Sequence, residues 1–405
     1  MHRSSHKFRA FVAMVGVVTL VLPNAIATQS EAVTIPITNI TSCAEPTDMN
    51  CIVSVTATFP DGHRVDAVNT GASHTWDSHD FQQNVRTYTA EEWSVDGLKN
   101  SSGTNTIVTQ IWYQAPDAGG GFGAMDLTIF GSLLDSPQEE IKSPLCETSN
   151  LMIPCRYPPQ LEAGVRFTLV INSNLIQPSF TSGQVDGASF SQKVIPGGYQ
   201  YTIGGAAIKI PVNLPDANGT SPGDFPQALD DRNYWHLYIV DARNNGQDWA
   251  AGKNCQTGNP IISSNAAVAG IPNFDPTTKQ VTLQVSSPHL SADGVTPETG
   301  VFQAAIPFSG VECLWGVAPK DLAAQASFSI TYADGTPASA ILTTKLSKNT
   351  FYVSASGYHY SSPTLHFTFH AANTASPVAK SVTCIKGKMS KTVSGTICPV
   401  GYKKK

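Results

Sequence analysis

The sequence predicts an all-β protein, with two or three β-sandwich (Ig-like) domains in series after a signal peptide and a short disulfide-closed basic tail. Three observations predict this class. Apolar and polar residues alternate with a period of two, and turn-forming residues separate the alternating runs. Charged residues make up only 14% of the chain, against ~25% in average globular proteins. The eight cysteines follow an N-terminal segment typical of exported proteins.

The clearest alternation lies between residues 280 and 370. The run Gln280–Val285 opens it, and three further runs follow. A period of two places one set of side chains toward a core and the other toward solvent. Asp334 and Gly335 can supply the tight turn of a hairpin. The alternating apolar residues are Phe328, Ile330 and Tyr332, then Phe351, Val353 and Ala355, then Leu365, Phe367 and Phe369.

Earlier segments rich in β-branched and aromatic residues predict further strands. Tyr234–Asp241 is apolar on both faces, which favours a central position in a sheet. The expected strands cover 33–38, 51–59, 63–69, 93–98, 106–113, 125–130, 164–172 and 234–241, with two more in 197–211. The expected organisation is a signal peptide at 1–27, a β-sandwich domain at 28–146, a linker at 147–160, a β-rich domain at 161–252, an Ig-like sandwich at 253–371, and a linker with a basic tail at 372–405.

The first 27 residues resemble an export signal. Arg3, Lys7 and Arg9 precede an apolar run at 11–22, and small residues lead to predicted cleavage after Ala27. A membrane anchor is the alternative, but the run is shorter than the ~20 residues needed to span a bilayer. We therefore expect a secreted, extracellular or cell-envelope protein without a transmembrane span after signal removal.

An even number of cysteines in an exported chain favours disulfides over metal ligands. No Cys-x-x-Cys pair is present, which argues against zinc and redox sites. Proximity in the sequence suggests the pairs Cys43–Cys51, Cys146–Cys155, Cys255–Cys313 and Cys384–Cys398, with no free thiol left.

The tail from Lys380 to Lys405 contains seven lysines and no acidic residue, whereas residues 28–379 carry a net charge of −15. A cationic patch attracts anionic polymers or membrane surfaces. The tail is thus a candidate attachment segment for anionic cell-envelope polymers; a solubilising end and a sorting signal are the alternatives. Its proposed attachment residues are Lys386, Lys388, Lys391, Lys403, Lys404 and Lys405.

Three patterns suggest chemistry, but each has a plainer interpretation. Gly219–Gly223 has the letters of a nucleophile elbow, yet nearby prolines favour a loop. His366 and His370 share a strand face, without an acidic or thiol partner nearby. Ser73–Asp80 contains His74, Asp77, His79 and Asp80, which could ligate a cation, although a polar surface loop is the simpler interpretation. We expect no catalytic residues, cofactor, metal or nucleic-acid partner.

Tryptophan and tyrosine side chains could instead bind glycans, since flat rings can stack on sugars. Trp76 and Trp249 lie in polar segments and are the better candidates for such contact. Trp235 lies in an apolar strand and Trp315 near Cys313, which favours core packing for both.

Two parts of the chain, the region from Ser287 to His370 and the tail, carry a resemblance to known proteins. Val311–Gly316 and Tyr358–Pro363 resemble a group of exported, uncharacterised actinobacterial β-rich proteins, as does Ser287–Gly294 before them. The tail segments Cys384–Lys388 and Cys398–Lys405 resemble a short module at the ends of many exported proteins of these bacteria. The resemblance implies export but brings no known activity or site residue.

Three functions stay open at this stage. A non-enzymatic structural or adhesive protein is favoured, because the chain carries an export signal, β architecture and no catalytic motif. A carbohydrate-binding module and a secreted hydrolase with a site assembled from distant residues are the alternatives.

Overall fold

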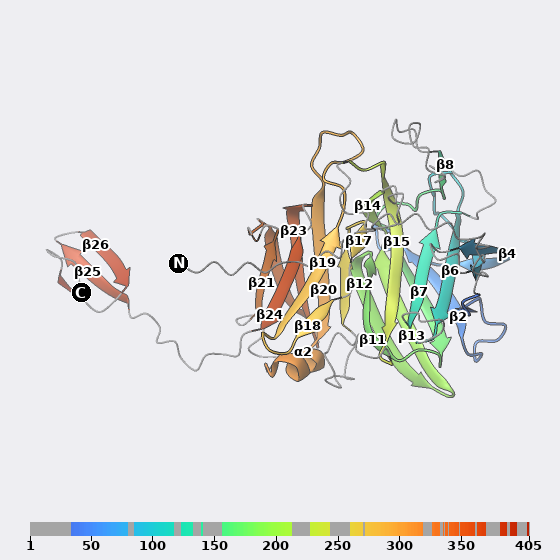
Figure 1. Ribbon diagram of the computed structural model, residues 1–405, viewed down its shortest axis with the longest axis horizontal. Helices are drawn as coiled ribbons and strands as arrows, with labels where there is room; N and C mark the ends of the chain where they lie inside the picture. Colours follow the sequence, from blue (N-terminus) through green and yellow to red (C-terminus); the bar gives the residue numbers. More distant parts are fainter. Residues whose placement is uncertain are drawn as a thin grey trace, which may run out of the picture.

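The computed structural model describes most of the chain from residue 34 onward (Figure 1). The described residues are 34–79, 85–116, 123–132, 139–140, 156–212, 227–243, 260–269, 272–318, 326–332, 335, 337–338, 340–347, 349–360, 363–369, 381–386, 389–394 and 403–404. Several predicted features lie outside them: the signal peptide at 1–27, Asp80, Cys146, Cys155, Gly219–Gly223, Trp249, Cys255, His370, Lys388, Cys398 and Lys405.

The all-β prediction is confirmed, and the dominant element is one long sheet. Its strands follow one another in the order β22 (Ile341–Ser347), β23 (Thr350–His359), β20 (Thr299–Pro307), β16 (Ile261–Ser264), β11 (Pro178–Gln184), β15 (Asp230–Asp241), β7 (Ala124–Phe130), β6 (Thr106–Gln114), β5 (Val85–Ser94) and β4 (Val68–His79). Two further strands join it: β1 (Thr38–Asn39) pairs with β6, and β14 (Ile208–Val212) pairs with β15.

Four smaller sheets complete the described fold. The second sheet has the order β12 (Asp186–Ile195), β13 (Gly198–Ala206), β10 (Arg166–Ser173), β2 (Cys51–Thr58) and β3 (Arg64–Asp66). The third comprises β17 (Val268–Ala269), β19 (Gln280–Ser286), β24 (Thr364–Phe369) and β21 (Ala326–Thr331), with β18 (Asn273–Asp275) paired to β19. In the tail, β25 (Ser381–Lys386) pairs with β26 (Met389–Ser394) and β27 (Lys403–Lys404), and a short pair joins β8 (Glu139–Glu140) to β9 (Arg156–Tyr157).

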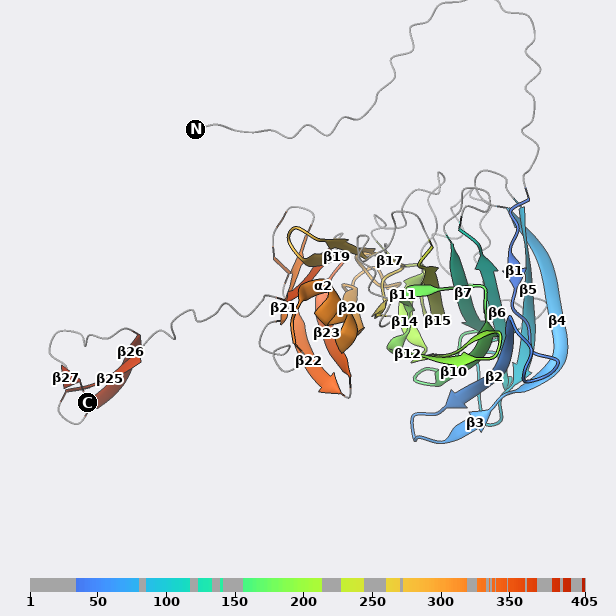
Figure 2. The same ribbon diagram turned by 90° about the horizontal axis from the view of Figure 1, so that it is seen from below.

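Two hydrophobic cores lie on opposite faces of the long sheet, because successive residues of a strand point to opposite faces. Trp235 and Leu237 of β15 pack in one core with Phe167 of the second sheet. Phe302 of β20 packs in the other core with Leu283 of the third sheet. Figure 2 shows the second and third sheets on opposite sides of the long sheet. The long sheet therefore provides one wall of each of two sandwiches.

Strand pairing connects the expected segments. β2, from the segment 28–146, pairs with β10, from the segment 161–252. β11 pairs in parallel with β16, from the segment 253–371. The division into three domains stays a prediction, but these hydrogen-bonded pairs cross its boundaries.

Many strand predictions are confirmed. The predicted strands at 51–59, 106–113 and 125–130 correspond to β2, β6 and β7. The central position of Tyr234–Asp241 is confirmed, since β15 lies between β11 and β7. Phe351, Val353 and Ala355 are buried as their alternation predicted.

Two segments differ from expectation. Residues 73–79, expected to lie in a polar surface loop, belong to β4 and pair with β5. Polar side chains alone do not reveal such a pairing. Phe308–Trp315, inside a stretch expected to be β-rich, forms the helix α2. Gly316 ends this helix at φ 71°, a left-handed conformation that glycine adopts without steric cost.

The Cys43–Cys51 disulfide is confirmed. Cys313 is also disulfide-bonded, and its pairing with Cys255 stays a prediction, as does Cys384–Cys398. Among the described residues, no cysteine is free and no helix is long and apolar enough to cross a membrane.

Candidate functional site

One face of the long sheet carries aromatic and polar side chains in register across five strands, and we call it the aromatic face. It lies on the side of β4, β5, β6, β7 and β15 that faces away from the second sheet's core. Within one row, Trp76 pairs with Tyr88, Trp112 with Asp126, and Asp126 with Tyr238. The residues of the aromatic face are His74, Trp76, Tyr88, Gln110, Trp112, Asp126, Thr128, Tyr234, His236 and Tyr238.

Neighbouring rings of the aromatic face contact one another. The ring centroids of His74 and Trp76 lie 5.7 Å apart, and those of Trp76 and Tyr88 lie 5.8 Å apart. Tyr88 meets Trp112 edge-on at 5.6 Å. These separations fall in the range of favourable aromatic pairs. All four side chains are half-buried, so each ring keeps part of its surface accessible.

A histidine–aspartate pair lies at the centre of the same face. His236 Nε2 and Asp126 Oδ2 are 2.9 Å apart, and both side chains are about one-fifth exposed. Burial lowers the pKa of His236, but attraction and hydrogen bonding by the Asp126 carboxylate outweigh it, and the net shift is upward. Tyr234 and Tyr238 flank the imidazole, with ring centroids about 6 Å away. The pair therefore provides fixed hydrogen-bonding groups between aromatic rings.

This combination suits the recognition of a polar ligand with flat apolar faces. The rings offer stacking surface, while carboxylate, imidazole and amide groups can exchange hydrogen bonds with hydroxyl groups. Among the described residues, no cluster has three side chains able to hold a metal ion. Two hydroxyl groups lie near the pair: Thr128 Oγ1 donates to Asp126 Oδ1 at 3.2 Å, and the Ser182 hydroxyl hydrogen-bonds Tyr238.

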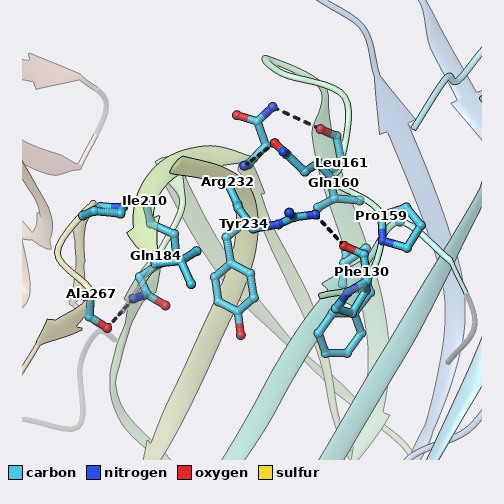
Figure 3. Close-up of a pocket in the computed structure, with 15 residues that line it drawn as sticks. Phe130, Pro159, Gln160, Leu161, Gln184, Ile210, Arg232, Tyr234 and Ala267 are labelled. Atoms are coloured by element: carbon cyan, nitrogen blue, oxygen red, sulfur yellow. Dashed lines mark hydrogen bonds between the residues drawn. The ribbon is translucent and has the colours of Figure 1, made fainter. Parts of the chain in front are cut away.

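A cavity of about 410 Å³ lies beside β14, β15 and the segment 158–161 (Figure 3). Its polar side chains are already engaged by the protein. Gln184 Nε2 donates to the carbonyl oxygens of Ala266 and Ala267, at 2.7 and 3.0 Å. Arg232 donates to Asp230 and to the Pro158 carbonyl. The remaining wall is mostly apolar, including Ile210, so this cavity offers few free groups for polar recognition.

A second pocket, of about 590 Å³, holds two interacting carboxyl groups. Asp231 is bound by Lys209, whose Nζ lies 2.8 Å from Asp231 Oδ2. Burial, followed by repulsion and hydrogen bonding from Asp231, raises the pKa of Glu298 to about 7. Glu298 therefore titrates near neutral pH.

The raised pKa of Glu298 predicts a pH dependence of stability. The folded pKa of Glu298 lies above its unfolded value of about 4.5, so the folded protein holds more protons between these values. The stabilisation is complete below pH 4.5 and is lost as pH rises through about 7. We expect Glu298→Gln to match the wild type at pH 5 and to be the more stable protein at pH 8, in thermal unfolding followed by circular dichroism. A variant less stable than the wild type at pH 8 would contradict the raised pKa of Glu298.

The predicted site residues fall in different places. Trp76 lies on the aromatic face with Tyr88 and Trp112, which the sequence did not single out. Trp235 and Trp315 are buried in the cores, as expected. His366 contacts Thr331 at 2.8 Å, and burial lowers its pKa. Asp77 accepts a hydrogen bond from Thr87 on the other face of β4, so it lies apart from Trp76 and His74.

The tail lysines are described only in part. Lys403 and Lys404 are exposed. Lys386 and Lys391 lie at positions of β25 and β26.

Searches against protein-family models, curated proteins and solved structures found no match to this chain. The fold and the aromatic face alone define the class of protein. It is an all-β protein that presents aromatic rings and polar side chains on one face of a continuous sheet.

Proposed function

We propose that the protein is a secreted or cell-surface adhesive protein that binds glycans through its aromatic face. The observation that carries the proposal is the register of Trp76, Tyr88, Trp112 and Tyr238 with hydrogen-bonding side chains across one sheet. A row of rings interleaved with donors and acceptors matches a sugar chain, whose rings alternate apolar faces with hydroxyl edges.

Other expectations join this proposal. Residues 1–27 would direct export, and the Ig-like character of the two sandwiches would suit a surface protein. The basic tail would attach the protein to anionic envelope polymers; the exposure of Lys403 and Lys404 supports this role.

The test is binding of the full chain to an array of neutral oligosaccharides. We expect Trp76→Ala to weaken binding by about tenfold, equivalent to about 1.4 kcal/mol, because it removes a stacking surface. Trp76→Phe should retain most of the affinity, since a ring remains.

Val194→Ala is the matched control, because Val194 is 75% exposed on the second sheet, away from the aromatic face. Selective binding that Trp76→Ala leaves intact would reject the aromatic face as the site. An array without any selective binding would reject the glycan-binding function itself.

A secreted hydrolase is the second candidate, favoured by one observation. A carboxyl group with a raised pKa can act as a general acid, and burial and repulsion by Asp231 raise the pKa of Glu298 to about 7. Hydrolysis of a generic ester, peptide or glycoside substrate that Glu298→Gln abolishes would support it.

A further inference from the structure

A groove of about 660 Å³ opens where the second sheet ends, on the face of the long sheet opposite the third sheet's core. Side chains of four adjacent strands, β16, β20, β23 and β22, form its floor. Ser263 pairs with Gln303, Gln303 with Ser354, and Ser354 with Thr343. These four polar residues form one row across roughly 14 Å, since neighbouring strands lie about 4.8 Å apart.

A second row runs beside the first and contains the groove's aromatic and basic residues. Ala305 pairs with Tyr352, and Tyr352 pairs with Lys345. The Tyr352 side chain is 39% exposed, which leaves ring surface free for a ligand. Lys345 is exposed, and no ion pair holds it among the described residues.

The opposite wall carries a second cation. Arg166 of β10 lines the groove and donates to the carbonyl oxygen of Gly187. A guanidinium has five N–H donors, so this bond leaves others for a ligand. No described carboxylate lines the groove; the nearby Asp186 accepts a hydrogen bond from Gln303 at 2.5 Å. The side chains that line the groove thus include two cations and no described carboxylate, on a chain whose net charge is −5.

The groove also contains a buried hydroxyl without a partner. Ser263 is 2% exposed and lines the groove, and its Oγ makes no hydrogen bond among the described residues. An unpaired buried hydroxyl costs free energy, and most buried polar groups are paired. A ligand hydroxyl in the groove would supply the missing partner.

We propose that this groove is a second binding site, specific for an acidic saccharide that carries carboxylate groups. A sugar ring stacks on Tyr352, and Lys345 and Arg166 bind the carboxylates. The hydroxyl groups of Ser263, Ser354 and Thr343 exchange hydrogen bonds with sugar hydroxyls. The site is separate from the aromatic face, so it does not depend on glycan binding there.

The test is calorimetric titration of the full chain with an oligogalacturonate tetrasaccharide. We expect saturable binding that weakens as salt concentration rises, because opposite charges contribute to it. Lys345→Ala and Tyr352→Ala should each weaken binding by about tenfold, whereas Tyr352→Phe should bind as the wild type does. Ser263→Ala should weaken binding while leaving the protein at least as stable, since it removes the unpaired hydroxyl.

Controls separate this site from the alternatives. Lys193→Ala removes the same charge from an exposed position of β12 outside the groove, and Trp76→Ala alters only the aromatic face. Neither should change the affinity. Absence of binding, an equal loss in Lys193→Ala, or equally tight binding of a neutral tetrasaccharide or inorganic phosphate would overturn the proposal.

Discussion

Trp235→Ala is expected to lower the free energy of unfolding by about 3–5 kcal/mol, the usual cost of truncating a fully buried tryptophan. Trp235 is 0% exposed, and its Nε1 donates to the Gly205 carbonyl at 2.8 Å, between the long and second sheets. The substitution leaves a cavity and an unpaired carbonyl oxygen in that core. Urea denaturation followed by circular dichroism measures the loss.

Trp76→Ala is the control for Trp235→Ala, because it removes the same side chain from a half-buried position outside both cores. A loss below about 1 kcal/mol in Trp235→Ala, the range expected for a surface site, would contradict the central placement of β15.

Asp241→Ala is expected to cost about 2–4 kcal/mol, because it breaks a buried charged network. Asp241 is 1% exposed; it accepts from Tyr113 at 3.0 Å and from the side chain of Arg243 at 2.5 and 2.9 Å. The Arg243 side chain is 46% exposed, so water can solvate its charge after the substitution. That solvation keeps the expected loss below that of a fully buried ion pair.

The same network raises the pKa of Tyr113 to about 12, through burial first and then repulsion by the Asp241 carboxylate. Spectrophotometric titration of Asp241→Ala should therefore show a tyrosine that ionises at lower pH than in the wild type. Asp77→Ala is the matched control for stability, since Asp77 is exposed and bonds only Thr87 among its described contacts. Equal losses in the two variants would contradict the buried network.

The sequence predicted strands well where one face of a strand is buried. Phe351, Val353 and Ala355 alternate with polar residues because one side meets the third sheet's core, and this pattern is visible in the letters. The residues of β4 gave no such signal, since their half-buried rings alternate with exposed Ser73, Thr75 and Asp77 on an outer strand. The helix α2 buries Gly310, Val311, Leu314 and Trp315 and has only 8 residues. A helical pattern of this length is too short to be recognised within a β-rich stretch.

The sequence singled out two members of the aromatic face, Trp76 for ring contact and His74 as a possible cation ligand. The remaining members come from β5, β6, β7 and β15, and only long-range pairing brings them into register. Alternation shows which residues of a strand share a face, but it does not show which strands are neighbours. The shared sheet escaped prediction for the same reason: the parallel pairing of β11 with β16 leaves no local mark in the sequence.

The two outermost strands of the long sheet, β22 and β4, affect whether the protein aggregates at high concentration. Outer strands can recruit strands from other molecules and start aggregation. β4 counters this with a register shift between Asn69 and Ser73, where Gly71 adopts a φ of 79°. β22 pairs with β23 without a register shift. It exposes the apolar residues Ile341, Leu342 and Leu346, and Lys345 is the charged residue among them. Colloidal stability at high concentration therefore depends most on β22, where one lysine opposes the stacking of copies edge to edge.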